Sequence, residues 1–160
     1  MPTVERIVRA GCPFAQIWAR LSDYQEAPRW DPRLESVERI EGDGGVGTVY
    51  RTRSMVAGVP TDGVLRVTLY RRHELLELRG AHAKLRAIET LKLLRGHHGA
   101  FVHWCSQLED PLDDAAARSG QVPGQVPGQV PGHVSGHVSG HVSERVGDAL
   151  VARLAAYLSD

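Results

Sequence analysis

The sequence lacks the features that define several classes of protein. Two cysteines, Cys12 and Cys105, are too few for a disulfide framework, and both are expected to be reduced thiols. No apolar run approaches the ~18 residues of a membrane span, and the opening MPTVERIVRAG lacks the apolar core of a signal peptide. The 19 basic and 19 acidic residues cancel, so no overall field attracts nucleic acid or a membrane surface. These absences predict one cytoplasmic domain.

Signatures of nucleotide, metal and nucleophile chemistry are also missing. The chain contains no GxSxG, P-loop, dinucleotide-binding or HExxH motif. His133, His137 and His141 are spaced by four, which would place them on one helical face and allow chelation of a metal. No cysteine or carboxylate is interleaved with them, and glycines alternate with them instead. We therefore predict neither a metal nor an organic cofactor.

Residues 142–160 have the pattern of one amphipathic helix. Large apolar side chains recur every four residues, at Val142, Val146, Leu150, Leu154 and Leu158. Ser143 is the expected N-cap. Burial of these five side chains would contribute on the order of 10 kcal/mol, whereas an isolated helix of this length is marginal in water. The helix therefore needs a large apolar surface to pack on.

Residues 1–110 have the pattern of a sheet with two short helices. Helical spacing covers Phe14–Leu21, and Gln25–Trp30 is expected to form a single turn. The segments with strand composition are Val4–Arg9, Leu34–Ile40, Gly47–Met55, Val64–Arg71, Leu75–Arg79, Leu85–Leu94 and Ala100–Leu108. Gly58–Gly63 has turn composition, and Leu85–Leu94 also shows near-helical spacing, although its position between strands favours a strand. Successive strands without interleaved helices predict an antiparallel sheet.

Residues 111–141 have a different composition. GQVP occurs three times from Gly120, and GHVS occurs three times from Gly132. Regular glycine with proline in the first half disfavours a helix, so this segment is expected to be a linker. The repeat valines are in phase with the apolar stripe of the final helix. The GHVS half is therefore expected to extend that helix by a turn or two.

This order of elements, together with several local motifs, resembles the START-related SRPBCC superfamily and its polyketide cyclase/dehydrase-like members. The motifs are Cys12-Pro13, Ile17-Trp18, Leu21-Ser22-Asp23, Trp30-Asp31-Pro32 and Gly45-Val46-Gly47-Thr48. The resemblance implies an α+β helix-grip fold, in which a seven-stranded antiparallel sheet wraps around a long C-terminal helix and two short helices follow the first strand. It also implies an apolar cavity between sheet and helix that takes hydrophobic small molecules such as lipids or polyketides.

Candidate ligand contacts are the residues expected to face that cavity. They are Trp30, Tyr50, Thr52, Leu65, Val67, Leu69, Glu89, Leu91, Leu150 and Leu154. Strand alternation would turn Leu65, Val67 and Leu69 inward and Tyr70 outward. An inward Glu89 would have a raised pKa suited to acid–base chemistry, whereas the alternative, which we favour, is a register or a different secondary structure that leaves it in water. Trp18 and Trp30 either line the mouth of the cavity or, as we favour, pack in the core.

Three functions fit these features. The favoured one is cofactor-free binding of a hydrophobic or aromatic small molecule by a monomer or homodimer that binds no nucleic acid. The first alternative is a cyclase/dehydratase-type enzyme acting on a polyketide-like substrate, with Glu89, His103 and Tyr50 as catalytic candidates. An enzyme would need at least two of these groups buried and close together. The second alternative is an interaction module that uses the repeat arm. The sequence leaves open which face of Ala100–Leu108 points inward.

Overall fold

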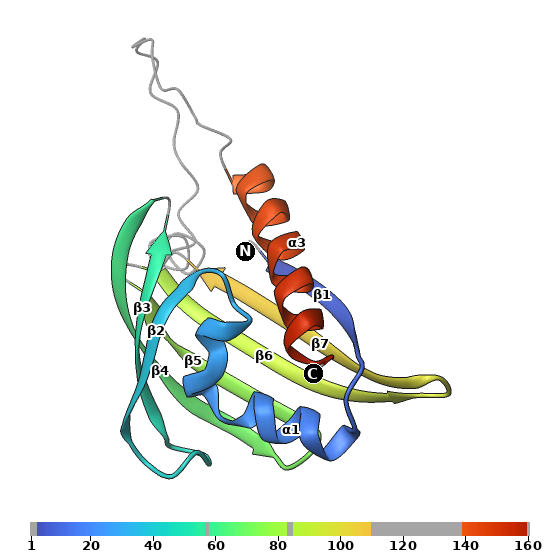
Figure 1. Cartoon of the computed structure of the whole chain (residues 1–160). Helices are drawn as coiled ribbons and strands as arrows, with labels where there is room; N and C mark the ends of the chain where they lie inside the picture. The colour runs from blue at the N-terminus through green and yellow to red at the C-terminus, as the bar shows by residue number, and fades with distance from the viewer. Residues whose placement is uncertain (1–2, 57, 83–84, 110–138, 160) are drawn as a thin grey trace, which may run out of the picture.

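A computed structural model describes residues 3–56, 58–82, 85–109 and 139–159 of the chain. Its sheet has seven antiparallel strands in the order β1-β7-β6-β5-β4-β3-β2 (Figure 1). The elements are β1 (Thr3–Ala10), α1 (Phe14–Ser22), η1 (Tyr24–Arg29), β2 (Leu34–Glu41), β3 (Val49–Val56), β4 (Val59–Arg71), β5 (Leu75–His82), β6 (Leu85–Gly96), β7 (Gly99–Glu109) and α3 (Ser139–Tyr157). The predicted strand at Leu85–Leu94 is confirmed as β6.

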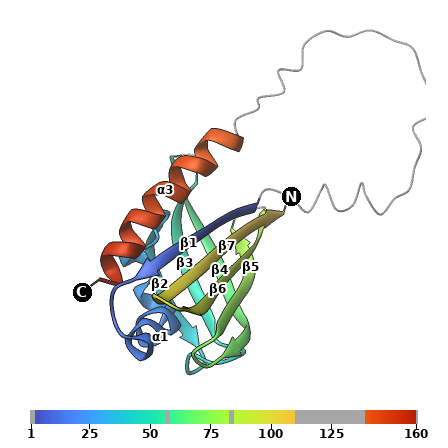
Figure 2. The same ribbon diagram turned by 90° about the vertical axis from the view of Figure 1, so that its right-hand side faces the viewer.

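The sheet curves around α3, which lies on its concave side next to β1 (Figures 1 and 2). The helix buries the C-terminal part of the predicted stripe, since Leu150, Leu154 and Leu158 are fully buried in the core, whereas Val146 is half-buried and the side chain of Val142 lies outside the described residues. The short helices α1 and η1 follow β1, and η1 contacts both α3 and β2. This arrangement is the α+β helix-grip fold expected from the order of the elements.

Local chemistry positions the two short helices. Pro13 precedes α1, where its fixed φ favours helix entry, and α1 buries Ile17, Trp18 and Leu21. The Asp23 side chain accepts a hydrogen bond from the Gln25 backbone N–H at 3.3 Å and so caps η1.

The end of α3 is tied to the loop that leads into α1. The backbone N–H groups of Gly11 and Cys12 donate to the Leu158 carbonyl at 3.0 and 2.8 Å. The last helical turn and the β1–α1 loop are thereby fixed to each other.

A bulge in β4 reverses part of the expected alternation. Val67 pairs with Leu78, but the next pair is Leu69 with Glu77. The extra residue places Leu69 beside Glu77 on the outer face and moves Tyr70 to the inner face, opposite the buried Leu76. The predicted orientations of Leu69 and Tyr70 are therefore both wrong.

Two predicted boundaries also differ from the structure. Gly58–Gly63 was expected as a turn, but β4 begins at Val59 and pairs with β3 up to Val56, with Gly58 at φ +78°. Pro60 is tolerated in the strand because, among the described residues, β4 pairs with β5 only from Gly63 onward, so the other edge of the strand is unpaired at this point. Helix α3 begins at Ser139, so the last repeat residues add a turn and Ser143 lies inside the helix rather than at its N-cap.

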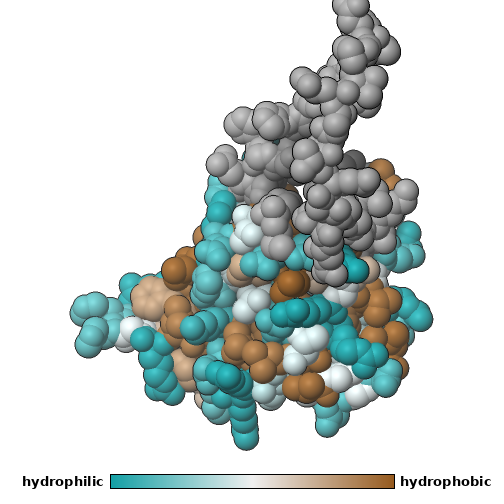
Figure 3. All heavy atoms as spheres, turned by 180° about the vertical axis from the view of Figure 1, so that it is seen from behind, coloured by the Kyte–Doolittle hydropathy of each residue, from teal (hydrophilic) through white to brown (hydrophobic). Residues whose placement is uncertain are grey.

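The convex face of the sheet carries hydrophilic and hydrophobic side chains interspersed with one another (Figure 3). Within the described part of the chain, no helix combines the length and the apolar character needed to cross a bilayer. Both cysteines are free thiols, as predicted.

Candidate functional site

The concave face of the sheet carries most of the residues predicted to contact a ligand. Each of the following exposes at most 3 % of its surface: Trp30, Tyr50, Thr52, Leu65, Val67, Glu89, Leu91, Leu150 and Leu154. Leu69, on the outer face, is the exception. Because the inward side chains close over one another, the cavity expected between sheet and helix is not open among the described residues.

A polar cluster lies within this apolar interior, with the guanidinium of Arg33 at its centre. Arg33 Nη2 donates to Asp31 Oδ2 at 2.7 Å and to Glu89 Oε1 at 3.1 Å, and Nη1 donates to Ser106 Oγ at 3.1 Å. The Ser106 hydroxyl donates to Glu89 Oε1 at 2.7 Å. The Arg33 guanidinium carbon also lies 4.9 Å from the centroid of the Trp104 ring. One cation thus links two buried carboxylates and stacks on an aromatic face.

Three separate elements bring these groups together. Asp31 and Arg33 lie in the loop between η1 and β2, where Asp31 Oδ1 accepts the Arg33 backbone N–H at 2.9 Å. Glu89 on β6 and Ser106 on β7 are direct cross-strand partners, so their side chains share the inner face. The Arg33 side chain is 23 % exposed, whereas those of Asp31 and Glu89 are 0 and 4 % exposed. Arg33 is therefore the member of the cluster that reaches the surface.

Two buried polar atoms at this site have no hydrogen-bond partner in the part of the chain that the structure describes. They are Trp30 Nε1, a donor, and Glu89 Oε2, an acceptor when the carboxyl is ionised. A buried polar group without a partner costs about 1–3 kcal/mol. The interior therefore carries unsatisfied hydrogen-bonding capacity beside an otherwise well-bonded cluster.

Burial controls the protonation of the cluster. Desolvation raises the pKa of Glu89, Arg33 opposes the rise, and the charge of Asp31 adds to it. Burial alone would lower the pKa of Arg33, but the two carboxylates outweigh it and raise that pKa well above its ordinary value. Arg33 therefore stays charged.

An aromatic wall adjoins the cluster. The Tyr24 ring centroid lies 6.2 Å from that of Trp30 and 5.7 Å from that of Tyr50. Burial raises the pKa of Tyr24 well above its usual value, and the charges of Glu89 and Asp31 add to the effect. Burial also raises the pKa of Tyr50. The phenols thus remain neutral and can donate hydrogen bonds.

Two of the three predicted catalytic candidates lie on the inner face of the sheet. Glu89 and Tyr50 are both buried on the inner face. His103 pairs with Lys92 and Ile7 on the outer face, where its Nε2 lies 3.8 Å from Glu5 Oε2. The inward residues of β7 include Ala100, Val102, Trp104 and Ser106. His103 is therefore removed from the candidate site, because strand alternation turns it away.

Sequence reasoning missed Asp31, Arg33, Ser106 and Tyr24 as site residues. Asp31 stands out in the sequence only as part of a Trp-Asp-Pro motif, and nothing marks Arg33 as inward-facing. The cluster depends on a loop folding back over β6 and β7, which no local pattern encodes. Trp18 and Trp30 are core residues, as favoured, and Trp18 Nε1 donates to the Tyr70 hydroxyl at 3.3 Å.

The described residues contain no group of three or more histidine, cysteine or acidic side chains arranged to hold a metal. The side chains of His133, His137 and His141, singled out for their spacing, lie outside the described residues.

The curved seven-stranded antiparallel sheet and the long C-terminal helix on its concave side define the helix-grip class of START-like proteins. A family model described as polyketide cyclase / dehydrase and lipid transport matches residues 1–158, and the chain belongs to that family. No curated protein sequence matches it.

Solved structures show the same fold at low sequence identity. The Zhui aromatase/cyclase from Streptomyces sp. R1128 is similar with a TM-score of 0.64 and 18 % identity, over 98 % of this chain and 93 % of that one. A START superfamily protein from Mycobacterium smegmatis is similar with a TM-score of 0.63 and 14 % identity, over 97 % and 98 %. A protein from Thermus thermophilus is similar with a TM-score of 0.64 and 15 % identity, over 98 % and 99 %.

Proposed function

We propose that the protein binds a hydrophobic or aromatic small molecule, lipid-like or polyketide-like, in the interior between the sheet and α3. The observation that carries the proposal is the pair of unsatisfied buried atoms, Glu89 Oε2 and Trp30 Nε1. A ligand hydroxyl would donate to the carboxylate oxygen, and a ligand carbonyl or hydroxyl oxygen would accept from the indole. The family description and the likeness to an aromatase/cyclase support a ligand of this kind.

The ligand would have both apolar and polar parts. Apolar side chains line the interior, and the residues we assign to its apolar contacts are Leu65, Val67, Leu91, Leu150 and Leu154. Tyr50 and Thr52 would supply further polar contacts, because both are buried on β3. A fused aromatic or acyl body with one or two oxygens matches this surface, whereas a sugar would leave most of its hydroxyls unpaired.

Entry requires an element to move, because the interior is closed. The Arg33 side chain is the partly exposed member of the cluster, and it lies in the loop that joins η1 to β2. Displacement of this loop with η1 would open the site without breaking the sheet. We place this activity in the cytoplasm, with the protein acting as a monomer or homodimer.

The test is native mass spectrometry of protein purified from its own host, followed by extraction and identification of any bound molecule. We expect an adduct of small-molecule mass, and we expect the extracted compound to bind the emptied protein again. Glu89→Gln should weaken binding by about tenfold, because a charge-assisted hydrogen bond becomes a neutral one. Glu77→Gln is the matched control, since Glu77 lies on the outer face of β5 and pairs with Arg79.

An empty protein that also rejects a panel of lipids and aromatic polyketides would overturn the proposal. Equal affinities for the wild type and the Glu89→Gln variant, with both folded by circular dichroism, would also overturn it.

The alternative is a cofactor-independent cyclase/dehydratase, favoured by the raised pKa of a buried carboxyl. Glu89 would transfer the proton, and the Tyr50 phenol would hold a carbonyl. Dehydration would lower the mass of the added ligand by one water, which the same mass spectrometry detects. Loss of that conversion in Glu89→Gln with binding retained would identify an enzyme. Ring closure without loss of water leaves the mass unchanged, so the extracted ligand is also compared with the added one by chromatographic retention. A ligand unchanged in both mass and retention would leave a binding protein.

A further inference from the structure

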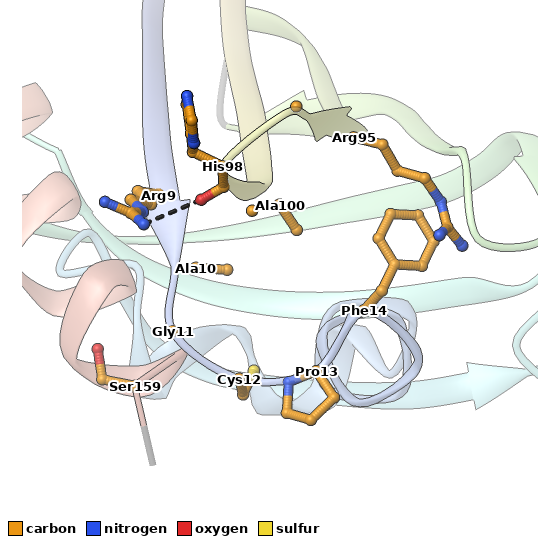
Figure 4. A pocket seen from close by; sticks show the side chains of 12 residues that line it. Arg9, Ala10, Gly11, Cys12, Pro13, Phe14, Arg95, His98, Ala100 and Ser159 are labelled. Atoms are coloured by element: carbon orange, nitrogen blue, oxygen red, sulfur yellow. Dashed lines mark hydrogen bonds between the residues drawn. The ribbon is translucent and has the colours of Figure 1, made fainter.

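A second site lies at the end of the sheet where β1 leads into α1 and where β6 turns into β7. It is an open pocket of about 780 Å³ on the surface, separate from the Arg33 cluster (Figure 4). Its lining comes from five parts of the chain: β1, the β1–α1 loop, the start of α1, the β6–β7 hairpin and Ser159, which follows α3. Tertiary packing alone brings these parts together.

The rim of this pocket is cationic. Arg9 and Arg95 lie on opposite sides of it, with His98 beside Arg9 (Figure 4). Arg9 Nη2 donates to the His98 carbonyl at 2.9 Å, which leaves further N–H donors of that guanidinium available. The Arg95 guanidinium carbon lies 3.7 Å from the centroid of the Phe14 ring. Among the described lining residues none is acidic, so positive charge concentrates here in a chain with no net charge.

The floor of the pocket is apolar. Ala10 and Ala100, which pair across β1 and β7, are 7 and 8 % exposed, and Phe14 forms the wall under Arg95. Both arginine side chains are held in place, one by a backbone carbonyl and the other by an aromatic face. Held guanidinium groups lose less side-chain entropy when they bind an anion, and their planar donors match phosphate and carboxylate oxygens.

We propose that this pocket binds a small organic anion, with a phosphate or carboxylate group at the arginines and an apolar portion over Ala10, Ala100 and Phe14. An organic phosphate fits best, because it carries up to two negative charges and its oxygens can accept two parallel N–H bonds from one guanidinium group. The proposal is independent of the interior ligand. The phosphate could belong to a soluble metabolite or to a lipid headgroup, and the experiment separates these sources.

The test is isothermal titration calorimetry of the full chain with hexyl phosphate, hexanoate, inorganic phosphate and hexanol. We expect hexyl phosphate to bind more tightly than hexanoate or inorganic phosphate, and hexanol to give no signal. Affinity should fall as salt rises, because the contacts are exposed ion pairs. The double variant Arg9→Gln/Arg95→Gln should lose at least about tenfold in affinity for hexyl phosphate.

Arg72→Gln is the matched control, because Arg72 is an exposed cation of the neighbouring β4–β5 turn and does not line the pocket. It should bind hexyl phosphate as the wild type does. Co-sedimentation with phosphatidylcholine vesicles that contain phosphatidic acid, lost in the double variant, would identify a lipid headgroup as the source of the anion. Soluble binding without co-sedimentation would identify a metabolite.

The proposal is overturned if the wild type binds no hexyl phosphate at millimolar concentration, if hexanol binds equally well, or if Arg72→Gln loses as much affinity as the double variant. Interior binding, measured by native mass spectrometry, should be the same in the double variant and the wild type. Failure at this pocket is thus distinguishable from failure of the proposed function.

Discussion

Replacement of Arg33 by methionine tests most directly how much the buried ion pairs of the interior contribute to stability. Methionine keeps much of the apolar stem but removes the guanidinium that bonds to Asp31, Glu89 and Ser106. Two carboxylates whose side chains are 0 and 4 % exposed then lose their shared cation. The variant is therefore expected to fold with lower stability.

The magnitude follows from burial. Removal of one partner of a buried ion pair typically costs about 3–5 kcal/mol, because the remaining charge is uncompensated. The Arg33 side chain is 23 % exposed, so solvent screens part of the interaction and the lower end, about 3 kcal/mol, is expected. For a domain of this size that loss corresponds to a fall in Tm of roughly 6–12 °C.

The loss should depend on pH with a definite sign. Burial raises the pKa of Glu89, and Arg33 holds that rise in check, so the variant raises the native pKa further. A group with a raised native pKa stabilises the fold below its unfolded pKa, about 4.3 for Glu, and this contribution is lost as pH rises through the native pKa. Because the native pKa of Glu89 is higher in the variant, the variant continues to lose stability at pH values where the wild type no longer does. The stability gap to the wild type should therefore be smallest near about pH 4 and widen as pH increases.

Urea denaturation at several pH values measures this gap. Arg79→Met is the matched control, because the Arg79 side chain is 57 % exposed on the outer face and a pair with one exposed partner is worth at most about 1 kcal/mol. Adding Glu89→Gln to Arg33→Met should restore part of the stability and flatten the pH dependence of the gap. A loss below about 1 kcal/mol, or a gap independent of pH, would refute the electrostatic account of this site.

Two further predictions concern close packing and thiol chemistry. A Cβ at Gly80 would clash with the Val64 backbone carbonyl, so Gly80→Ala should lower the free energy of unfolding, measured by urea denaturation, by at least about 2 kcal/mol. The new methyl of Gly147→Ala would meet only a flexible arginine side chain, so this variant should leave the free energy of unfolding unchanged or raise it by up to about 1 kcal/mol. Similar changes in both variants would contradict this account of the packing. Burial and the adjacent Glu5 raise the pKa of the Cys105 thiol to about 11. Glu5→Gln removes the nearby negative charge, so alkylation of Cys105 should become several-fold faster at alkaline pH, as measured by peptide mass spectrometry. Equal alkylation rates in the variant and the wild type would show that Glu5 does not raise this pKa.

Much of the fold could be read from local patterns. Strand composition and glycine-rich turns located seven strands, and the spacing of Leu150, Leu154 and Leu158 located the face of α3 that is buried. The errors arose where strand pairing, rather than residue composition, decides which face of the sheet a side chain points to. The bulge between Val67 and Leu69 exchanged the faces of Leu69 and Tyr70, and a bulge leaves no mark in hydrophobic alternation.

The candidate site was only half predictable. Glu89 was named as a candidate because it shares a strand face with leucines, although an exposed position was favoured for it, and the structure places it inside. His103 had a comparable appearance in sequence, yet cross-strand pairing with Lys92 turns it outward. Register sets the inner face of a strand, and register is a property of the whole sheet.

The sequence by itself determined the order of the elements, the antiparallel sheet and the apolar stripe that α3 buries, because these depend on residue periodicity over short stretches. Only the tertiary structure decided that Arg33 bridges Asp31 and Glu89, and that Arg9 and Arg95 face a common pocket. Both groupings join residues far apart in the chain. Their free energies depend on burial and charge proximity, which arise only once the sheet has closed around its helix.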